Sequence, residues 1–390
     1  MNDVAEKPRS VQLEGPIDTI PITFVGHPWA PIGMGEQLRS HIAALSSLHM
    51  HHTVLDIYRY AARTDAGHEE IIGDREIREP PGGIRIFHVN GDEVDTVFTT
   101  FEARGGVIGD GFNIVVPAWE LPIYPAEWAE KLRRFDEVWA LSTFIRASLK
   151  AAGIESHLIG QAIEPLAGPL LPRRHFGIRE SAYVLLNFFD LSSYASRKNP
   201  EAVLALFDRL RAANPYADIQ LVLKAKQGER GAEAWAREWA ATHGAAGRIH
   251  VLATPLDTLG VRSLITACDC FVSLHRAEGF GRGLGEAMAL GRLAMGTNWS
   301  GNTDFLNPSN GLAINYELVP LQDGDYPHWE GQSWAEPDVG HAFEVLNPII
   351  HNPSLGRAIA RKGQVDVLHT HGNRAVGLRI VDRLERIIAA

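Results

Sequence analysis

The chain has 390 residues, more than a single hydrophobic core normally serves, so we expect two domains. Hydrophobic residues make up 45% of it and charged residues 22%, as in an ordinary globular protein. The formal net charge of -10 argues against nucleic acid as a partner, because neutralising phosphates requires concentrated lysine and arginine.

Residues 1–19 are polar, and we expect them to form a flexible lead without the basic and apolar regions of a signal peptide. No apolar run approaches the roughly 18 residues that a membrane span requires, so we expect a cytoplasmic protein. A local basic patch would still allow peripheral contact with the inner face of a membrane. Lys131, Arg133 and Arg134 on one predicted helix are the candidates, with a solvated helix face as the alternative.

Strands and helices alternate along the first part of the chain. A buried strand over 20–26 leads into a turn with Gly33 and Gly35, and a helix is predicted over 36–48. Further strands are predicted over 53–58, 84–89, 113–116, 137–141 and 155–158. This alternation implies a mostly parallel sheet covered on both faces, and we predict an α/β domain over 20–165.

The apolar, proline-rich stretch 166–180 is interpreted as a linker between two domains. A second series follows, with strands at 183–188, 219–223, 249–252, 270–274 and 293–296 and helices at 201–212, 232–242, 256–267 and from Gly285. The repeated order predicts a second doubly wound α/β domain over 181–370. Ligands in such sheets bind at the carboxyl ends of the strands.

Two further features concern the second half of the chain. The aromatic and proline-rich segment 315–337 reads as a long structureless loop, which is often functional, with a packed surface excursion as the alternative. Cys268 and Cys270 lie too far apart along one predicted strand for a disulfide, and we interpret both as buried thiols.

The most informative segment runs from Cys270 to Gly291: a short apolar strand, a glycine-dense turn and a helix, with Glu278 and Glu286 at the two ends of the turn. Glycine lets backbone approach a ligand where a Cβ atom would collide, and the N–H groups of a turn and helix start can bind an anion. Carboxylates accept hydrogen bonds from hydroxyl groups. The pattern therefore favours a sugar attached to a phosphate.

Other glycine-rich motifs fit this segment less well. A dinucleotide fingerprint fails on register, because its third glycine would fall on Leu284 or Glu286, and no Gly-Lys-Ser/Thr follows as in a phosphate-binding loop. The carboxylate pair of glycosidases flanks the bond across a cleft, about 5 to 9.5 Å apart, rather than sharing one turn. A plain turn with solvated glutamates is the remaining alternative.

The Glu278-x7-Glu286 block, set in Ser-Leu-His-Arg-x-Glu-Gly-Phe-Gly, resembles the signature of the retaining group 1 glycosyltransferases of the GT-B fold. Other blocks resemble a branch of these enzymes that builds bacterial polysaccharides and includes mannosyltransferases; they begin at Trp119, Asn187, Ser196, Trp299 and Trp334. The resemblance implies two Rossmann-like domains facing a cleft, the first on the acceptor side and the second on the donor side. It also implies a final helix, 371–390, that crosses back to the first domain.

The resemblance implies that Lys198 binds the diphosphate of the donor. Arg197 is the candidate second cation, ranked below Lys198 because neighbours in an extended loop usually point apart. Lys224, at the end of a predicted strand, is a third candidate, with an ordinary strand-terminating lysine as the alternative. Many relatives carry an arginine directly after the first strand of this domain. Here Asn187-Phe-Phe-Asp190 stands in its place, which leaves the second cation open.

By the same resemblance, Glu278 contacts hydroxyl groups of the donor sugar, Gly279, Phe280 and Gly281 offer backbone N–H groups, and Glu286 accepts hydrogen bonds from the ribose. A carboxylate that accepts from a vicinal diol discriminates against ligands that lack one.

In the first domain, Gly33 and Gly35 resemble the glycine-rich loop that approaches the donor's phosphates or the acceptor, with a plain turn as the alternative. Glu120 follows a strand at the place where many relatives carry a histidine near the reacting sugar. Together with Trp119 it would stack on and hydrogen-bond a hexose. His27 also follows a strand and is a candidate for the acceptor side, with a polar cap as the alternative.

The resemblance implies a retaining hexosyltransferase that moves a hexose, with mannose from GDP-mannose favoured, to a glycan or lipid-linked acceptor. A UDP-sugar donor with the same machinery and a non-catalytic nucleotide-sugar-binding protein are the alternatives, and the presence of Lys198, Glu278 and Glu286 argues against the second. The histidines show no HExxH spacing, so we predict no metal site and no cofactor beside the nucleotide-sugar substrate.

Overall fold

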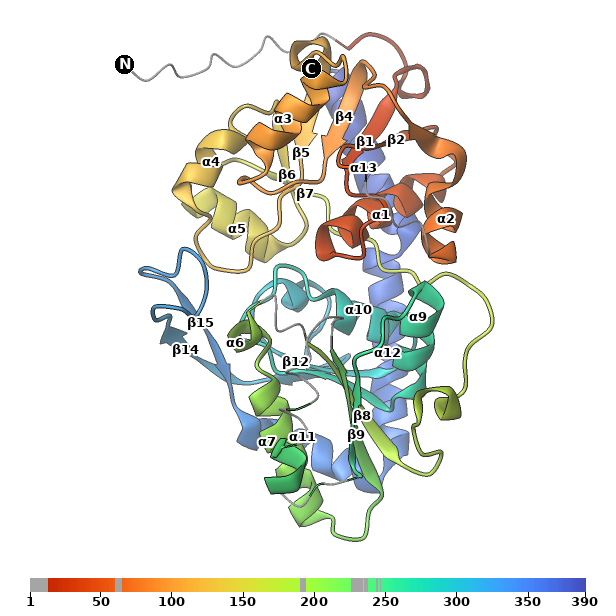
Figure 1. Cartoon of the computed structure of the whole chain (residues 1–390), viewed down its shortest axis with the longest axis vertical. Coiled ribbons are helices and arrows are strands. Elements are labelled where there is room, and N and C mark those ends of the chain that lie inside the picture. The colour runs from red at the N-terminus through yellow and green to blue at the C-terminus, as the bar shows by residue number, and fades with distance from the viewer. Residues whose placement is uncertain are drawn as a thin grey trace. The chain divides into compact units, whose positions relative to one another are not determined.

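The chain divides into two compact units, which are described one at a time. Unit 1 consists of Met1–Ile163 and Thr370–Ala390, and unit 2 of Glu164–His369 (Figure 1). The computed structural model describes residues 13–59, 65–189, 194–225, 234, 238–242, 245 and 247–390. Most of the lead expected over 1–19 therefore lies outside the described residues, and the 3-10 turn Ile17–Thr19 lies within them.

Unit 1 is built on a parallel seven-stranded sheet with the order β3-β2-β1-β4-β5-β6-β7. Its strands are β1 (Ile22–Gly26), β2 (Thr53–Asp56), β3 (Glu76–Ile77), β4 (Gly83–Phe87), β5 (Gly111–Val115), β6 (Glu137–Ala140) and β7 (His157–Leu158). β1 is buried at every position, as expected for a central strand with both faces covered. The prediction missed β3, because two residues are too few for a periodic signal.

The helices of unit 1 follow its strands. They are α1 (Gly33–Ser46), α2 (Ala66–Ile72), α3 (Val94–Ala103), α4 (Ala126–Leu132), α5 (Thr143–Ala151) and α13 (Asn373–Ile388). Short 3-10 turns lie at Gly73–Arg75 and Ile108–Asp110.

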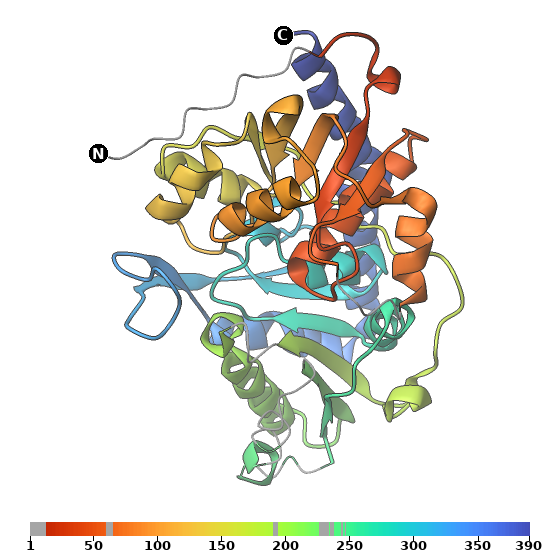
Figure 2. The same cartoon turned by 45° about the horizontal axis from the view of Figure 1, so that its top comes forward.

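The C-terminal helix α13 belongs to unit 1 and packs on α1 (Figure 2). Gly377 allows the close approach, because a Cβ atom there would lie 2.5 Å from the carbonyl oxygen of Ala44. Arg383 donates two hydrogen bonds to Glu137 of β6, one of them 2.7 Å long from Nε to Oε1. Glu137 is only 9% exposed, so the pair fastens α13 to the sheet in a largely dry environment.

Replacing Arg383 tests this link. Arg383→Ala leaves the Glu137 carboxylate without its bidentate partner, and we expect the free energy of unfolding to fall by about 2 kcal/mol, as for a partly buried ion pair broken on one side. Arg386→Ala on the same helix is the control, since its pair with Asp382 is exposed. Urea denaturation measures both, and equal losses for the two variants would contradict the proposed role of Arg383.

Buried histidines make the stability of unit 1 depend on pH. Burial is the main cause that lowers the pKa of His41, His52 and His371 from 6.5 to about 4. Between these values the unfolded chain binds more protons than the folded one, so stability is full above pH 6.5 and falls as the pH drops toward 4. Thermal unfolding followed from pH 8 downward should show this decline. A transition temperature that stays level between pH 6.5 and 4 would contradict it.

Unit 2 is built on a parallel six-stranded sheet with the order β10-β9-β8-β11-β12-β13. Its strands are β8 (Tyr183–Phe189), β9 (Ile219–Ala225), β10 (Ile249–Leu252), β11 (Cys270–Ser273), β12 (Leu293–Thr297) and β13 (Leu312–Ile314). The central strands supply the apolar core on which the helices pack. Cys268 and Cys270 are free and buried, which confirms the prediction for both thiols.

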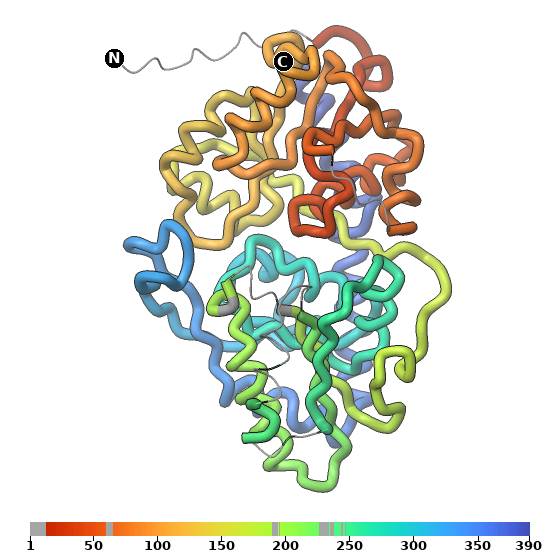
Figure 3. The backbone as a smooth tube through the Cα atoms, viewed as in Figure 1, coloured from red at the N-terminus to blue at the C-terminus, as the bar shows by residue number. Residues whose placement is uncertain are grey.

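Among the described residues, the helices of unit 2 are α6 (Ala195–Lys198), α7 (Pro200–Ala213), α9 (Thr258–Ala267), α10 (Arg282–Ala289), α11 (Val339–His351) and α12 (Pro353–His371) (Figure 3). The last two residues of α12, Thr370 and His371, are assigned to unit 1. The helix predicted over 232–242 lies largely outside the described residues. In the stretch interpreted as a linker, Arg173 donates to the carbonyl of Ala267 at 2.9 Å and pairs with Asp269, so this part packs on unit 2.

The segment 315–337 is not a structureless loop, and that expectation is wrong. It forms an antiparallel hairpin of β14 (Tyr316–Pro320) and β15 (Ser333–Pro337), which extends to one side of the unit 2 sheet (Figure 2). Val319 lies opposite Trp334 in this ladder. Cross-strand pairs of a β-branched and an aromatic side chain stabilise such ladders. Pro320 and Pro337 are the last residues of the two strands, and an edge position of this kind tolerates the missing N–H of proline.

Candidate functional site

The site of unit 2 lies where its sheet changes winding direction. The chain goes from β8 to β9 on one side and from β11 to β12 on the other, and such a change of direction predicts a crevice at the carboxyl ends of β8 and β11. The backbone pairing of these strands covers only two positions and stops at Leu186. Beyond it, the side chain of Asn187 donates to the carbonyl of Val272 at 2.8 Å and holds the two diverging strands together.

Glu278 is the centre of this site, because two cations from the other side of the crevice reach its carboxylate. Lys198 donates to Oε1, and Nη1 of Arg197 lies 3.2 Å from Oε2. The same guanidinium also donates to the carbonyl of Ala277 at 2.9 Å. The side chains of Glu278, Arg197 and Lys198 are 12%, 6% and 22% exposed, so the three charges are largely shielded from water.

Both cations reach Glu278 because they lie on a helical turn rather than in an extended loop. The reason for ranking Arg197 below Lys198 is therefore wrong: neighbours in the single turn α6 do not point to opposite sides. After this turn Asn199 takes the left-handed conformation with φ of 51°, and its side chain caps α7 by accepting from Ala202. This cap fixes the end of the turn that carries Lys198.

The two cations keep Glu278 ionised. Burial raises its pKa, but Lys198 and then Arg197 outweigh burial and lower the pKa to about 2. A carboxylate with this pKa holds no proton at neutral pH. Glu278 is therefore built to accept hydrogen bonds, not to act as a general acid.

The glycine-dense turn packs tightly against the segment that follows β12. The N–H of Glu278 donates to Ser300 Oγ at 2.9 Å, and the N–H of Gly301 donates to the carbonyl of Glu278 at 2.9 Å. A Cβ atom on Gly301 would lie 2.0 Å from the carbonyl of Gly279. Gly281 has φ of 85° and starts α10, where a side chain would meet Asn302. The fold of the turn itself thus requires these glycines.

Phe280 and Glu286 complete the predicted set in this turn and helix. Phe280 is 5% exposed and packs against Phe305. Glu286 lies on α10, one turn after Arg282, whose Nε is 2.8 Å from Oε1. Lys224 is the residue before the last of β9, close to the predicted strand end, and donates to the carbonyl of Ala225 at 2.5 Å.

His275 was not singled out from the sequence, yet it is fully buried beside this turn. Its Nε2 lies 3.0 Å from Asn302 Oδ1, and its carbonyl accepts from the Thr297 hydroxyl at 2.6 Å. Burial lowers its pKa, and Glu278 acts in the opposite direction. The signal that could have found it is its position two residues after β11.

Arg276 connects the cation-bearing turn to the hairpin. Its Nε is 2.5 Å from Glu336 Oε2 on β15, and its Nη1 donates to the carbonyl of Ser196 at 2.7 Å. Ser196 in turn donates through its hydroxyl to the carbonyl of Asp325 at 2.9 Å. The hairpin therefore braces the turn that carries Arg197 and Lys198.

In unit 1, Gly33 and Gly35 lie within the first turn of α1 and not in a turn before the helix, which corrects the expected start at residue 36. A Cβ atom on Gly35 would lie 2.2 Å from the carbonyl of Ala30, so Gly35 serves the packing of α1 on the preceding loop. Gly33 has open space at the same position. A ligand approaching this helix start would therefore meet Gly33.

Glu120 and Trp119 follow β5 in unit 1. Trp119 is 3% exposed, its Nε1 donates to the carbonyl of Ile123 at 2.8 Å, and its ring packs on Tyr124 and Trp128. This indole packs within unit 1 rather than offering a face to a sugar. Glu120 is half-buried at the carboxyl side of the sheet.

The lysine and arginines considered for membrane contact are matched by acids. Lys131 and Arg134 both pair with Asp95, at 2.8 and 2.6 Å, and Arg133 pairs with Glu130 at 3.1 Å. These contacts favour the solvated helix face over a basic patch. Among the described residues, no helix is both long and apolar enough to cross a membrane.

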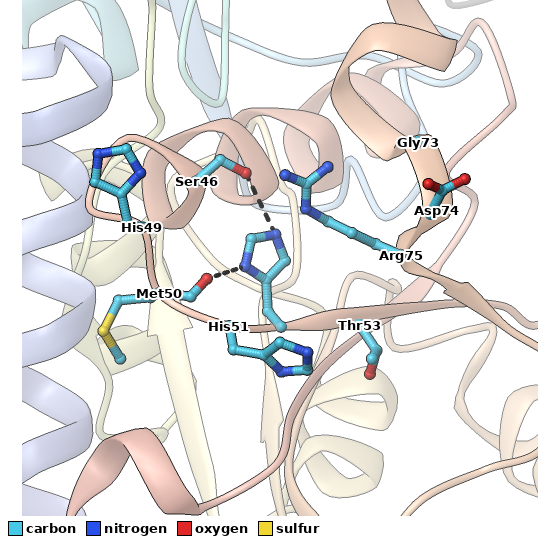
Figure 4. A pocket seen from close by; sticks show the side chains of 9 residues that line it. Ser46, His49, Met50, His51, Thr53, Gly73, Asp74 and Arg75 are labelled. Atoms are coloured by element: carbon cyan, nitrogen blue, oxygen red, sulfur yellow. Dashed lines mark hydrogen bonds between the residues drawn. The ribbon is translucent and has the colours of Figure 1, made fainter.

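A pocket of about 570 Å³ in unit 1 lies near the amino ends of strands β2 and β3 (Figure 4). Its lining comes from the segments that lead into β2 and β3, around His49, His51, His52 and Arg75. The ring of His52 contacts the Met50 carbonyl at 2.8 Å and the Ser46 hydroxyl at 3.4 Å. Because ligands of doubly wound sheets bind at the carboxyl ends, this pocket is not the chemical site. Within the described part of the chain, no group of three His, Cys, Asp or Glu residues could hold a metal ion.

The comparisons with known proteins agree with this geometry. Residues 186–315, which carry Arg197, Lys198, Glu278 and Glu286, match the family model described as Glycosyl transferases group 1. No curated protein matches the chain.

Several solved structures share the fold. HepE of Anabaena in complex with UDP and glucose has a TM-score of 0.68 at 14% identity, with 94% of this chain and 100% of that chain covered. Sucrose-phosphate synthase of Thermosynechococcus elongatus has a TM-score of 0.66 at 14% identity, with 95% of this chain and 99% of that chain covered. The lipopolysaccharide outer core galactosyltransferase WaaB has a TM-score of 0.61 at 14% identity, with 94% of this chain and 99% of that chain covered. The chain thus has the predicted GT-B fold of two Rossmann-like units, and its residues 186–315 are similar to the group 1 glycosyl transferases.

Removing one cation tests the site. For Lys198→Ala we expect turnover to fall on the order of a hundredfold, the usual loss when one charged donor facing developing charge is removed. Folding should change little, because Arg197 still pairs with Glu278. Steady-state kinetics and thermal unfolding provide the two measurements. Lys362→Ala, which removes the exposed partner of Asp366 in the same unit, is the control, and an equal rate in both variants would exclude Lys198 from the site.

Proposed function

We propose that the chain is a retaining, metal-independent glycosyltransferase that moves a hexose from a nucleotide sugar to a glycan or lipid-linked acceptor. One observation carries the proposal: Glu278, Lys198 and Arg197 meet across the crevice of the unit 2 sheet, inside the segment that matches the group 1 family model. A fold alone would not suffice, since related folds host many activities.

The charges of this site fit a sugar diphosphate. Two cations face one carboxylate, which leaves one positive charge in excess for the diphosphate of a donor. As the bond between the anomeric carbon and the phosphate oxygen breaks, its electron pair stays on the diphosphate. Lys198 and Arg197 then stabilise the growing negative charge.

Glu278 has the complementary task toward the sugar. Held ionised by its neighbours, it accepts hydrogen bonds from hydroxyl groups of the hexose and stabilises the positive charge that develops on the ring. The proposed role of Glu286 is to accept from the ribose hydroxyls, which its place on α10 after the glycine turn supports. Both tasks need carboxylates and no proton transfer from them.

The donor is the part of the proposal with two candidates. The sequence blocks around Trp299 and Trp334 resemble the mannosyltransferase branch, which favours mannose from GDP-mannose. HepE, which shares the fold at 14% identity, is solved with UDP-glucose, which favours a UDP-sugar. We retain GDP-mannose as the first donor to test and UDP-sugars as the second.

A donor panel tests the function. We expect one class among GDP, UDP and ADP sugars to raise the unfolding temperature of the full chain, because a ligand that binds only the native state stabilises it by mass action. The same donor should be consumed with acceptor in the presence of EDTA, and proton NMR of the product should show a retained anomeric configuration.

Glu286→Ala should weaken binding of that donor about tenfold, the equivalent of roughly 1.4 kcal/mol for a lost charged hydrogen bond. Glu344→Ala, on helix α11 of the same unit, is the control and should bind the donor normally. Unchanged donor affinity by calorimetry would refute the ribose role. A chain that binds the donor but never turns it over would instead point to the non-catalytic alternative.

A further inference from the structure

Unit 1 contains a polar cluster at the same topological position as the site of unit 2. β1 and β4 are neighbours, and the chain continues from β1 to β2 on one side and from β4 to β5 on the other. The crevice predicted by this change of direction lies at their carboxyl ends. His27 follows β1 directly, Tyr58 follows β2 by two residues, and Glu93 follows β4 at the start of α3.

These three side chains contact one another. His27 Nε2 lies 3.0 Å from Glu93 Oε1, and the Tyr58 hydroxyl donates to the same oxygen at 2.9 Å. The rings of His27 and Tyr58 stack with 3.8 Å between their centroids and 11° between their planes. The second carboxylate oxygen of Glu93 accepts from the N–H of Asn90 at 2.9 Å.

The cluster is not explained as a helix cap. Glu93 occupies the position before α3, where an acidic side chain normally accepts from the first N–H groups of the helix, yet it makes no such bond. Its carboxylate is used on His27 and Tyr58 instead. Burial raises the pKa of Glu93, and the hydrogen bonds from His27, Asn90 and Tyr58 outweigh it and lower the pKa, so the carboxylate is ionised at neutral pH.

An ionised Glu93 determines which ring nitrogen of His27 carries the hydrogen. Because the carboxylate only accepts, Nε2 of His27 carries the hydrogen, and in the neutral ring Nδ1 is left as an acceptor. Among the described residues Nδ1 has no partner. The His27 side chain is 14% exposed and that of Glu93 26%, so both side chains keep a partial contact with solvent.

The surrounding charges indicate the kind of ligand. Asp92 and Glu93 are adjacent, and burial followed by Glu93 raises the pKa of Asp92. Two neighbouring carboxyl groups disfavour an anionic phosphate and leave neutral hydroxyl groups as the matching partners. Asn90 also accepts from the N–H of Ala118 at 2.9 Å, which ties the cluster to the segment of Glu120.

We propose that His27, oriented by Glu93 and Tyr58, binds a hydroxyl group of the carbohydrate acceptor through Nδ1. This proposal rests on the proposed function, since it assigns the acceptor to unit 1. His27 contacts the ligand directly, whereas Glu93 is a positioning residue that fixes the ring and its tautomer.

The test uses the full chain labelled with ¹⁵N-histidine and three soluble probes: methyl α-mannoside, methyl glucoside and methyl galactoside. We expect at least one glycoside to shift the Nδ1 resonance of His27, as a nitrogen that accepts a new hydrogen bond does, and His27→Ala to weaken binding of that glycoside about tenfold. If no probe shifts the His27 ring, or if His27→Ala binds with unchanged affinity, the proposal is overturned.

Three variants separate positioning from folding. Tyr58→Phe retains an aromatic ring beside His27 and removes one donor to Glu93, so glycoside affinity should stay within about twofold. Glu93→Leu should abolish the Nε2–H preference in the ring spectrum and reduce affinity like His27→Ala, while Glu93→Gln, which still accepts from Nε2, should restore much of it. Loss of affinity in Glu93→Leu without a tautomer change, or no rescue by Gln, would contradict the positioning role.

Donor binding is measured separately by thermal stabilisation with GDP and UDP sugars. The His27 and Glu93 variants should bind the donor as the unaltered chain does. A chain that binds no nucleotide sugar would end the proposed function, while the glycoside titration would still decide the His27 site by itself.

Discussion

The interaction on which the candidate site depends is the contact of one nearly buried carboxylate with two cations across a divided sheet. Glu278 follows β11 and the cations follow β8, so neither strand alone could assemble the cluster. Removing the charge of Glu278 from water is costly, and Lys198 and Arg197, with a smaller contribution from His275, keep it ionised with a pKa of about 2. The winding of the parallel sheet thus brings the charges together, and their pairing keeps the crevice polar.

The parts around this cluster serve to hold its geometry. Gly281 and Gly301 allow two backbone segments to lie closer than side chains would permit. Arg276 joins the cation-bearing turn to Glu336 of the hairpin, so a surface element that looks peripheral in the sequence supports the turn that carries Lys198. A catalytic constellation requires such support, because a small displacement of a charged group costs much of its effect.

Each unit places a carboxylate beside nitrogen-bearing side chains at the change of direction of its sheet. In unit 2 these are Glu278 with Arg197 and Lys198, and in unit 1 Glu93 with His27. The first set has an excess of positive charge and suits a diphosphate. The second is neutral or negative and suits hydroxyl groups, which is the division of labour that a transfer from a charged donor to a carbohydrate acceptor demands.

The sequence by itself determined the alternation of strands and helices, the two buried thiols and the glutamate block, because these depend on local periodicity and on residue types at fixed spacing. Sequence reasoning ranked Arg197 below Lys198 as a diphosphate-binding cation and missed the hairpin ladder over 316–337. It also did not identify the roles of His275 and Arg276 or the contact of His27 with Glu93. Those features depend on contacts between residues that are not neighbours in the sequence: His275 lies 27 positions before Asn302, and Arg276 lies 60 before Glu336. His27 and Glu93 are 66 positions apart, and Lys198 and Glu278 are 80 apart. Only the tertiary structure decided them, because the order of strands in each sheet, which no local pattern specifies, determines which loops meet at its edge.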